Sequence, residues 1–411
     1  MSQKSTSVPQ LRVAIIGAGI AGLSLAACLR KHPQFSVTVY ERREADYTES
    51  SAAVGLRTNG ISIVKHLGIT RQEIRAVVGA GYRTYNLQEE QMSKSLVGFG
   101  PDGQGALWFV FRQDLKDALL RKATNSDSEG EPVPVLYGAH VVGVEPEAGI
   151  IELAHGEFMK VDLIVGADGI HSRIRTSVIP SSHPEPTPCG LSVYRFVLPM
   201  EIVRDAIGAE DTMPTMYEYT NGTFVAIIAA GDEENRNVVM YPCRGHEQMN
   251  IACAISDSSL RRPDLLEYSW TAKGSVNEMV EGIHGFPEWL KRVFSRAPRA
   301  DLFQVRDQEP LPTYVKGRTV LIGDAAHAMV PYQGQGANQA LEDVEGLDVL
   351  LANVKDRKEI PDLLQLWDSV RRPRASEIQR GSRASQAKIA TKSASDAILS
   401  VKPHVGFLFL A

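Results

Sequence analysis

Three glycines near the N-terminus have the spacing of a turn that binds a dinucleotide. Gly17, Gly19 and Gly22 follow residues 11–16, which have the pattern of a buried strand, and residues 23–29 have helical composition. Glycines in such a turn allow a tight bend, close approach of the backbone to a pyrophosphate, and close packing of helix on strand. The N-terminus of the helix adds free N–H groups and a positive dipole end. The alternative is an ordinary turn between a strand and a helix.

An acidic residue follows where such units bind a ribose. Residues 36–40 alternate in polarity and include β-branched residues, which predicts a second strand that ends at Glu41. Glu41 lies about 20 residues after the glycines, where a carboxylate accepts hydrogen bonds from a ribose diol. The same carboxylate would repel a 2′-phosphate, so it favours an ADP moiety such as that of FAD or NAD. The neighbouring Arg42 and Arg43 weaken that choice.

The chain contains one such fingerprint. Gly79-Ala80-Gly81 follows no predicted strand and lacks the third glycine. A protein that holds two dinucleotides in two such units would show two fingerprints. The sequence therefore predicts one dedicated nucleotide site, and any second nucleotide is expected to bind transiently.

Two later strand ends carry an aspartate. A strand pattern at residues 161–165 leads into Asp168 and Gly169, and another at residues 318–322 leads into Asp324. By itself, each aspartate could cap a helix that begins there.

The remaining patterns predict a second sheet and further helices. Several strand candidates between residues 190 and 256 favour a mostly antiparallel sheet, which could lie against a substrate. Residues 135–144 are strand-like. Residues 275–297 and 361–400 look helical, and another helix is expected from near Gly336 to about residue 353.

Composition and charge exclude several classes of protein. The chain has 411 residues, 43% of them hydrophobic and 23% charged, which is typical of a globular protein with two or three domains. The net charge of -5 gives no electrostatic attraction to nucleic acid. Four cysteines without a C-x-x-C pair predict free thiols and no metal site. No apolar run has the length of a signal peptide or a spanning helix, so we expect a cytoplasmic protein without a membrane span.

Three separated motifs together resemble the single-component, flavin-dependent aromatic hydroxylases of the salicylate hydroxylase type. The first is the glycine turn with Glu41. The second is GADGIHSRIR at residues 166–175, and the third is GDAAH at residues 323–327, followed by Pro331 and GQG at residues 334–336. The resemblance implies that the tightly held nucleotide is FAD.

The same resemblance implies which residues contact FAD. Asp324 would accept hydrogen bonds from the ribityl hydroxyls, and Asp168 would lie between the pyrophosphate and a passing NADH or NADPH. The segment from Pro331 to Ala337 would approach the flavin ring, and the helix that begins there would stabilise negative charge on the reduced ring. Further contacts are implied for backbone near the cofactor and for the arginine of an R-x-x-L element: Val54, Gly55, Gly334, Gly336 and Arg112.

Residues that bind the aromatic ring are also implied. Arg195 fits an arginine of the substrate sheet that holds phenolate charge and makes the ring more electron-rich. Tyr241 is the better match for a tyrosine that binds and deprotonates the ring, and Tyr217 is an earlier candidate. Their alternative role is packing and pairing within the sheet. Gly55 stands where a pyridine-hydroxylating relative has a catalytic histidine, which argues against pyridine chemistry.

The expected fold class is α/β, with a Rossmann-like FAD-binding domain interleaved with a mostly antiparallel β-sheet domain for the substrate and followed by C-terminal helices. The FAD-binding domain is discontinuous, because its motifs are far apart in the chain. The expected boundaries are residues 1–80, 101–178 and 305–355 for the FAD-binding domain, 81–100 and 179–304 for the substrate-binding domain, and 356–411 for the C-terminal helical segment.

The expected activity is that of a monooxygenase. NAD(P)H would reduce FAD, dioxygen would add to give a flavin 4a-hydroperoxide, and its distal oxygen would pass to a phenol or a salicylate-like ring. The partners would then be a small aromatic substrate, dioxygen, and NADH or NADPH. The alternatives are a flavin-dependent oxidase or reductase without oxygen transfer, and a non-enzymatic nucleotide-binding module. The sequence leaves open the substrate, the choice between NADH and NADPH, and the oligomeric state.

Overall fold

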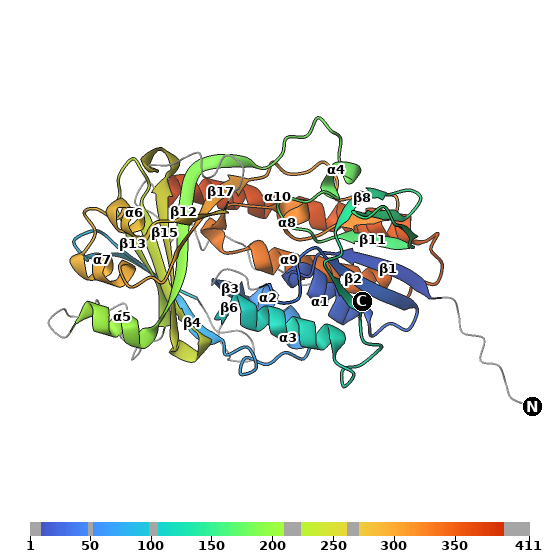
Figure 1. Ribbon diagram of the computed structural model, residues 1–411, viewed down its shortest axis with the longest axis horizontal. Helices are drawn as coiled ribbons and strands as arrows, with labels where there is room; N and C mark the ends of the chain where they lie inside the picture. Colours follow the sequence, from blue (N-terminus) through green and yellow to red (C-terminus); the bar gives the residue numbers. More distant parts are fainter. Residues whose placement is uncertain (1–9, 48–51, 98–105, 209–222, 261–270, 390–411) are drawn as a thin grey trace, which may run out of the picture.

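The computed structural model describes residues 10–47, 52–97, 106–208, 223–260 and 271–389. Figure 1 shows two large sheets toward opposite ends of the molecule, with helices between and around them. Tyr217, one of the predicted substrate-binding residues, lies outside the described residues.

The glycine turn belongs to a six-stranded sheet with the order β18-β19-β11-β1-β2-β7. Only β18 runs antiparallel to its neighbour. The central strand is apolar and buried at five of its six positions, as a parallel sheet covered on both faces requires. The strands are β1 Leu11–Ile16, β2 Phe35–Glu41, β7 Val135–Tyr137, β11 Leu163–Gly166, β18 Val315–Lys316 and β19 Thr319–Leu321.

The strand order of this sheet reverses at β1. Strand β2 pairs with one side of β1 and β11 pairs with the other, both in parallel. In open parallel sheets, ligands bind outside the carboxyl ends of the strands at such a reversal. The glycine turn, Glu41 and Asp168 follow or end these three strands, so the topology brings them to one edge of the sheet.

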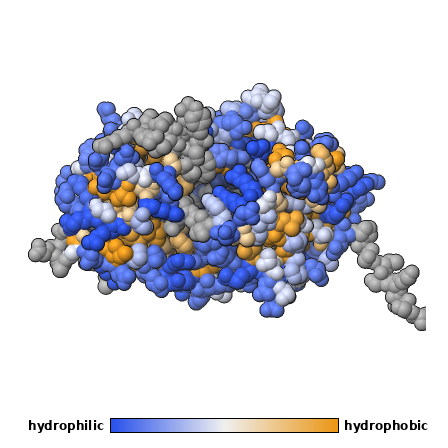
Figure 2. Space-filling view, in the orientation of Figure 1, coloured by the Kyte–Doolittle hydropathy of each residue, from blue (hydrophilic) through white to orange (hydrophobic). Residues whose placement is uncertain are grey.

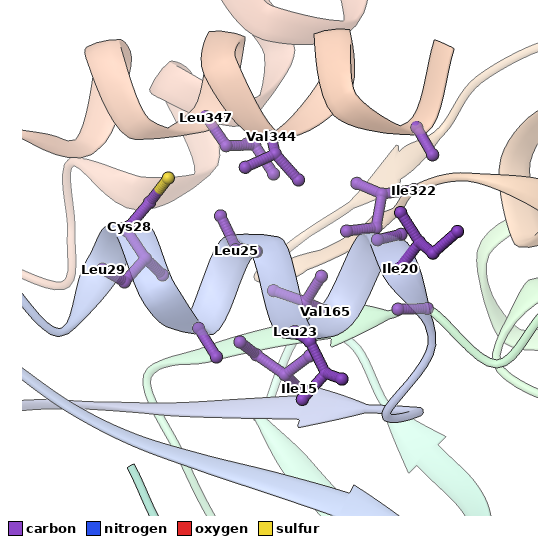
Figure 3. Packing of buried hydrophobic residues seen from close by; sticks show 14 of the residues in the cluster. Ile15, Ile20, Leu23, Leu25, Cys28, Leu29, Val165, Ile322, Val344 and Leu347 are labelled. Atoms are coloured by element: carbon purple, nitrogen blue, oxygen red, sulfur yellow. The ribbon is translucent and has the colours of Figure 1, made fainter. Parts of the chain in front are cut away.

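Helix α1 (Ile20–Leu29), which follows the glycine turn, is buried at all ten of its positions. Figure 3 shows it between Ile15 of β1 on one side and Val344 and Leu347 of α9 (Gly336–Leu351) on the other. A helix covered on both sides needs small or apolar residues all round, and the sequence IAGLSLAACL supplies them. The predicted strand, glycine turn and helix are therefore confirmed.

The second large sheet has ten strands in the order β16-β17-β12-β15-β14-β13-β4-β6-β3, with β5 paired to β4. All neighbours are antiparallel except β13 and β4, so the predicted, mostly antiparallel sheet is confirmed. Its strands are β3 Ala53–Arg57, β4 Val77–Tyr85, β5 Gln91–Leu96, β6 Leu107–Phe111, β12 Thr187–Pro199, β13 Thr223–Ala229, β14 Asn237–Cys243, β15 Gln248–Ser256, β16 Thr271–Gly274 and β17 Ala300–Asp307.

The two faces of the ten-stranded sheet pack against different parts of the chain. Tyr194 of β12 belongs to a core with Trp289 of the outer helices. Val193 belongs to a separate cluster with Val330, the residue before the predicted flavin-facing segment. Because successive side chains of a strand point to opposite faces, Arg195 shares the face of Val193. The outer helices are α5 Met200–Ile207, α6 Val276–Gly282 and α7 Glu288–Phe294.

Two predicted elements are divided in the structure. The strand pattern at residues 135–144 forms β7 and β8, which belong to different sheets, because Gly138 between them has a φ of 70° that turns the chain. The helical pattern at residues 275–297 forms α6 and α7, since Gly285 and Pro287 interrupt it. Strand β8 lies in a third sheet of β8 Val141–Glu145, β9 Ile150–Leu153 and β10 Phe158–Lys160.

A long C-terminal helix, α10 (Ile360–Ile389), touches both large sheets. Its Asp368 accepts a hydrogen bond of 2.8 Å from the N–H of Tyr314, which precedes β18. Its Arg383 forms an ion pair with Asp307 of β17. In Figure 1, α10 extends from beside the ten-stranded sheet toward the six-stranded sheet. The other helices are α2 Thr58–His66, α3 Arg112–Thr124, α4 Arg175–Val178, α8 Asp324–His327 and the short helices η3 Arg244–His246, η4 Asp257–Ser259 and η6 Pro331–Gln333.

The sheets do not divide the chain where the predicted domains do. Strands β3 and β6 fall in the ranges assigned to the FAD-binding domain, yet they pair at the edge of the ten-stranded sheet. Strand β4 begins at Val77, before the assigned boundary at residue 80. The domain boundaries remain predictions, and residues 390–411 of the C-terminal segment lie outside the described residues.

The surface and the cysteines carry few special features. Figure 2 shows hydrophilic side chains over most of the visible face, with apolar ones in small groups. Cys28, Cys189, Cys243 and Cys253 are free thiols. Within the described ranges, no helix has the length and apolar character needed to cross a membrane. In the same ranges, no three His, Cys, Asp or Glu side chains form a group that could hold a metal ion.

Candidate functional site

The three glycines of the first turn face three different surroundings. Gly17 has a φ of 110°, and a Cβ there would collide with the carbonyl oxygen of Ala167. A Cβ on Gly22 would collide with the carbonyl oxygen of Gly17. A Cβ on Gly19 would meet nothing within 4 Å. The chain itself therefore requires glycine at the first and third positions, whereas the second opens onto free space at the N-terminus of α1.

Glu41 lies beside this turn at the end of β2. One carboxylate oxygen accepts a hydrogen bond of 2.8 Å from the N–H of Ala18, and the other accepts one of 2.9 Å from the N–H of Arg43. These bonds fix the carboxylate next to the open glycine while leaving lone pairs on both oxygens. The guanidinium of Arg43 lies over the ring of Tyr47, 4.3 Å from its centroid.

Asp168 is held in the loop after β11 with one oxygen to spare. Its Oδ2 accepts hydrogen bonds of 2.8 Å from the N–H of Arg173 and 3.3 Å from the N–H of Ile174. Its Oδ1 is buried and has no partner among the described residues. A buried carboxylate oxygen without a donor is costly, so this atom fits a site that receives a donor from outside the chain.

Arg175 ties the loop of Asp168 to the third motif. Its buried guanidinium donates to the carbonyl oxygens of Ile170 at 2.7 Å and Ala325 at 3.3 Å, and to Glu185 at 3.0 Å. Ala325 belongs to α8, which begins at Asp324. Arg175 and Ala325 are 150 residues apart in the sequence, so this side chain connects the second motif to the third.

Asp324 presents its carboxylate to solvent at the end of the β19 strand. The preceding Gly323 has a φ of 60°, which turns the chain there. The Asp324 side chain is exposed and makes no hydrogen bond with any described residue. A Cβ on Gly336 would lie 3.9 Å from its Oδ1, so the carboxylate lies beside the N-terminus of α9.

The segment before α9 is held against β3 by a residue that the sequence did not single out. Asn338 donates to the carbonyl oxygens of Gly55 at 3.0 Å and Gly334 at 2.9 Å. Its own oxygen accepts a hydrogen bond of 2.8 Å from the N–H of Arg57. The amide is fully buried, and it connects the predicted flavin-facing turn to the strand that carries Val54 and Gly55. In the sequence, only its position directly after Ala337, the end of the predicted flavin-facing segment, indicates such a role.

Arg195 points from β12 toward the same region without an anionic partner. Its guanidinium lies 5.5 Å from the ring centroid of Phe303 and has no hydrogen-bond acceptor among the described residues. Burial lowers the pKa of Arg195, the neighbouring Tyr241 raises it, and the positive charge of Arg112 lowers it further. The structure therefore brings Arg195, Tyr241 and Arg112 close enough for their charges to interact.

Tyr241 uses its hydroxyl to hold β3. The hydroxyl donates a hydrogen bond of 2.9 Å to the carbonyl oxygen of Ala53, and its ring centroid lies 4.8 Å from that of Phe109. The N–H of Ala53 donates a bond of 2.9 Å to Asn250, which pairs with Tyr241 across β14 and β15. Burial raises the pKa of Tyr241 well above its usual value. At neutral pH this hydroxyl is a donor.

Arg112 occupies the first position of α3, directly after β6. Its N–H donates a hydrogen bond of 2.9 Å to the carbonyl oxygen of Ala52, the residue before β3. Strand β3 therefore has neighbours on three sides: α3, the side chains of β14 and β15, and the turn before α9. Sequence reasoning missed Asn250, because an asparagine within a strand carries no pattern of its own.

The observed features fit FAD. The free space at Gly19 offers room for a phosphate at the N-terminus of α1. Along the same edge of the sheet, the unpaired oxygen of Asp168 and the exposed carboxylate of Asp324 offer two hydrogen-bond acceptors. A parallel sheet with this turn and a second sheet beside it define a flavoprotein of the FAD-binding class.

Comparison with known proteins gives the family. A family model described as "FAD binding domain" matches residues 10–382, and the chain belongs to that family. It is an FAD-dependent monooxygenase of the salicylate hydroxylase type.

Three relatives illustrate the similarity. An FAD-dependent monooxygenase, cfoG of Aspergillus candidus, is 30% identical over 383 residues, which are 91% of this chain and 85% of the relative. A salicylate hydroxylase of Pseudomonas putida is 28% identical over 410 residues, covering 92% of this chain and 86% of the relative. The solved structure of a salicylate hydroxylase substrate complex has a TM-score of 0.74 at 26% identity, covering 98% of this chain and 100% of that one.

Proposed function

We propose that this protein hydroxylates an electron-rich aromatic ring, a phenol or a salicylate-like compound, with NADH or NADPH and dioxygen as co-substrates. The observation that carries the proposal is the guanidinium of Arg195, which shares the face of Val193 in the ten-stranded sheet and has no hydrogen-bond acceptor among the residues that the structure describes. The salicylate hydroxylases among the relatives support a substrate of this kind.

An unpaired guanidinium in this position suits an anionic ring. Arg195 is half-buried, and a positive charge that is partly removed from water gains from an opposite charge. A phenolate or carboxylate would supply that charge. By stabilising the phenolate, Arg195 would also lower the pKa of the phenol and make the ring more electron-rich. We propose Arg195 as the residue that binds and activates the substrate.

Tyr241 is proposed to work beside Arg195. The raised pKa and the bond to Ala53 make it a poor base, so the proton that leaves the phenol need not go to this hydroxyl. Its contact with the substrate would be through the ring, with β3 held in place by the hydroxyl. Tyr217 stays a prediction, since it lies outside the described residues.

FAD is proposed to lie along the edge that carries the three motifs. Gly17, Gly19 and Gly22 would form the turn under the pyrophosphate, with Glu41 accepting from the ribose of the ADP moiety. Asp168 and Asp324 would accept hydrogen bonds from the part of FAD that links the adenine ring to the flavin ring. The remaining predicted contacts are the backbone of Val54 and Gly55, the side chain of Arg112, and the segment of Pro331, Gly334, Gly336 and Ala337.

The reaction would balance as follows. When bound, FAD supplies the redox chemistry: it accepts a hydride from NAD(P)H and lets the two electrons activate dioxygen. One oxygen atom enters the ring as a hydroxyl group, and the other leaves as water with the hydride-derived proton and one from solvent. The chain's own contribution is to position the ring, hold its negative charge and exclude water.

The test is consumption of NADH and NADPH with a panel of phenols and benzoates, combined with mass spectrometry of the products. A substrate that gains one oxygen atom as the nucleotide is oxidised supports the proposal. If no compound gains oxygen, and a substrate reduces the flavin in the absence of NAD(P)H and of air, the protein is an oxidase instead. A colourless protein that does not bind FAD would contradict both.

A further inference from the structure

A buried group of charged side chains lies behind the exposed Asp324, and the proposed function does not use it. His327 of α8, Glu342 and Asp343 of α9, and Arg371 of α10 all have no exposed surface. Fully buried charges are tolerated only where they are paired and hydrogen-bonded, because each charged group loses its hydration when it is buried. The group therefore connects three helices, α8, α9 and α10, through paired charges.

Asp343 is the centre of this group. Its Oδ2 accepts a hydrogen bond of 2.8 Å from the N–H of Gly323 and lies 2.6 Å from Nε2 of His327. Its Oδ1 accepts bonds of 3.0 and 2.8 Å from the guanidinium of Arg371. Both oxygens are thus occupied, one by the turn that carries Asp324 and one by the C-terminal helix.

The charges of the group favour an ionised Asp343. Burial would raise the pKa of this carboxyl, but the opposing charges of His327 and Arg371 outweigh it and hold the pKa below the usual value. Arg371 is itself bonded to Glu342 at 2.8 Å, and Glu342 receives Arg374 at 2.8 Å as well. Asp343 therefore stays ionised, and an acceptor, at neutral pH.

The bond to Gly323 is the step that matters for the cofactor. Gly323 has a φ of 60° and precedes Asp324, so its orientation decides where the Asp324 carboxylate points. Gly323 is also the residue whose carbonyl oxygen accepts the N–H of His327 at 3.0 Å. The turn is therefore held from its N–H side by Asp343 and from its carbonyl side by the helix that contains His327.

We infer that Asp343 is a positioning residue for FAD: together with His327 and with Arg371 of α10, it fixes the Gly323 turn and so aims the carboxylate of Asp324 at the cofactor. The inference rests on the role of Asp324 that is proposed above. It gives the C-terminal helix an indirect part in cofactor binding, through the bonds of Arg371 to Asp343.

The experiment is a double-mutant cycle on FAD affinity, measured by titrating the full-length apoprotein with FAD and following flavin fluorescence. Asp343→Asn is isosteric, but it removes the charge and one acceptor; we expect the dissociation constant to rise about tenfold. Asp324→Ala should raise it by about 100-fold on its own. In the Asp324→Ala background, Asp343→Asn should then add less than about twofold, since nothing is left to aim.

Two results of the cycle separate the possible failures. If Asp343→Asn raises the dissociation constant equally in both backgrounds, the effect does not pass through Asp324 and the inference is overturned. If Asp324→Ala alone leaves FAD affinity unchanged, the proposed role of Asp324 is wrong. The matched control is Arg372→Gln on α10, whose partner is Asp368 and not the turn; it should leave the dissociation constant unchanged.

His327 provides a second pair of variants in case Asp343→Asn does not fold. Glutamine keeps an N–H that can donate to Asp343, whereas leucine of similar size cannot. His327→Leu should weaken FAD binding about tenfold, and His327→Gln should recover most of the affinity. Equal affinities in the two variants would show that only the volume of the side chain matters, against the inference.

Discussion

At the scale of single residues, the three glycines of the first turn serve different neighbours. At Gly17 and Gly22 a side chain would collide with backbone atoms of the chain itself, whereas Gly19 borders free space beside the N-terminus of α1. Folding and cofactor binding can therefore be separated within one short motif.

Alanine at each position should show this separation. Gly19→Ala should lower the free energy of unfolding of the apoprotein by no more than about 1 kcal/mol, because its φ of −83° suits alanine and only the N-cap preference is lost. Its FAD affinity should fall at least tenfold, because the new methyl group fills the space proposed for the pyrophosphate.

Gly22→Ala is the matched comparison, and it should destabilise the fold by about 1–3 kcal/mol or more through the clash with Gly17. Urea unfolding of the apoproteins and FAD titration give the two quantities. If Gly19→Ala binds FAD normally, the open side of the turn is not where the cofactor approaches.

Arg195 is the second residue whose role can be isolated. Arg195→Met keeps much of the side chain but removes the charge, so KM for a phenolic or benzoic substrate should rise by about 10–100-fold, the worth of a charge-assisted hydrogen bond. The FAD dissociation constant should stay within about twofold. Steady-state kinetics and FAD titration measure both.

Two further variants interpret that result. The KM of Arg195→Lys should lie between those of the unmodified protein and Arg195→Met, because lysine keeps the charge without the fork of donors. Arg296→Met is the control, since Arg296 lies on the outer side of the substrate sheet near Asp205. Loss of FAD from Arg195→Met with an unchanged KM would place the guanidinium at the cofactor and not at the substrate.

At the scale of elements, β3 connects the two halves of the site. Tyr241 and Asn250 of the substrate sheet hold the carbonyl oxygen and the N–H of Ala53, and Asn338 of α9 holds Gly55 and Arg57. Strand β3 therefore links β14 and β15 to the turn before α9 through side-chain hydrogen bonds.

Removal of the two bonds to Ala53 should have overlapping effects. Tyr241→Phe and Asn250→Leu should each lower the free energy of unfolding by about 1–3 kcal/mol, since each leaves a backbone group of Ala53 unpaired. The double variant should lose less than the sum, because both side chains restrain the same residue. Urea unfolding measures all three.

The pH profile of turnover then decides between positioning and proton transfer. With its pKa raised by burial, Tyr241 should act as a donor across the working range, so Tyr241→Phe should leave the profile unshifted. A shifted profile would mean that this hydroxyl takes the substrate proton. Tyr85→Phe is the control, because the buried Tyr85 hydroxyl has no partner among the described residues and its removal should cost nothing.

At the scale of the whole molecule, α10 joins the two sheets and its charges reach the cofactor edge. Arg383 pairs with Asp307 of the substrate sheet, and Arg371 pairs with Asp343 behind the FAD edge. The two sheets are thus coupled by a helix that follows both of them in the chain, in addition to β3.

Buried thiols should make the whole molecule sensitive to alkali. Burial raises the pKa of Cys243 and of Cys253 to about 12. In the unfolded chain a thiol ionises near pH 8.5, so above that pH the unfolded state binds fewer protons than the native state. Stability must therefore fall as pH rises from about 8.5 to 12, by about 1.4 kcal/mol per pH unit for each thiol.

Urea unfolding between pH 8 and pH 10.5 tests this directly. The free energy of unfolding of Cys253→Ala should fall less steeply with pH than that of the unmodified protein, by about 1.4 kcal/mol per unit. The comparison uses slopes, so the cavity left by the substitution does not enter. Identical slopes would contradict a protonated native thiol.

Much of the fold could be read from local pattern. The strand at residues 11–16, the strands between residues 190 and 256, the glycine turn, and helices α1 and α9 follow from runs of residues that are close in sequence, and the structure places them there. The α/β fold class and the FAD-dependent monooxygenase family followed from three motifs whose residues are each contiguous.

The rest depended on contacts between distant segments. Which sheet a strand joins is decided by pairing, and no local feature of β3 or β6 shows that they close the edge of the ten-stranded sheet. Likewise Asn338, Asn250 and Asp343 each depend for their roles on at least one partner more than 15 residues away.

The sequence by itself determined the family, the cofactor and the turn that begins its site, because short-range sterics and strand or helix periodicity are properties of neighbouring residues. Only the tertiary structure decided how that site is held: which carboxylates are occupied, which guanidinium finds no acceptor among the described residues, and which helix fixes the Gly323 turn. These depend on burial and on hydrogen bonds that close over long loops, and neither is defined until the chain has folded.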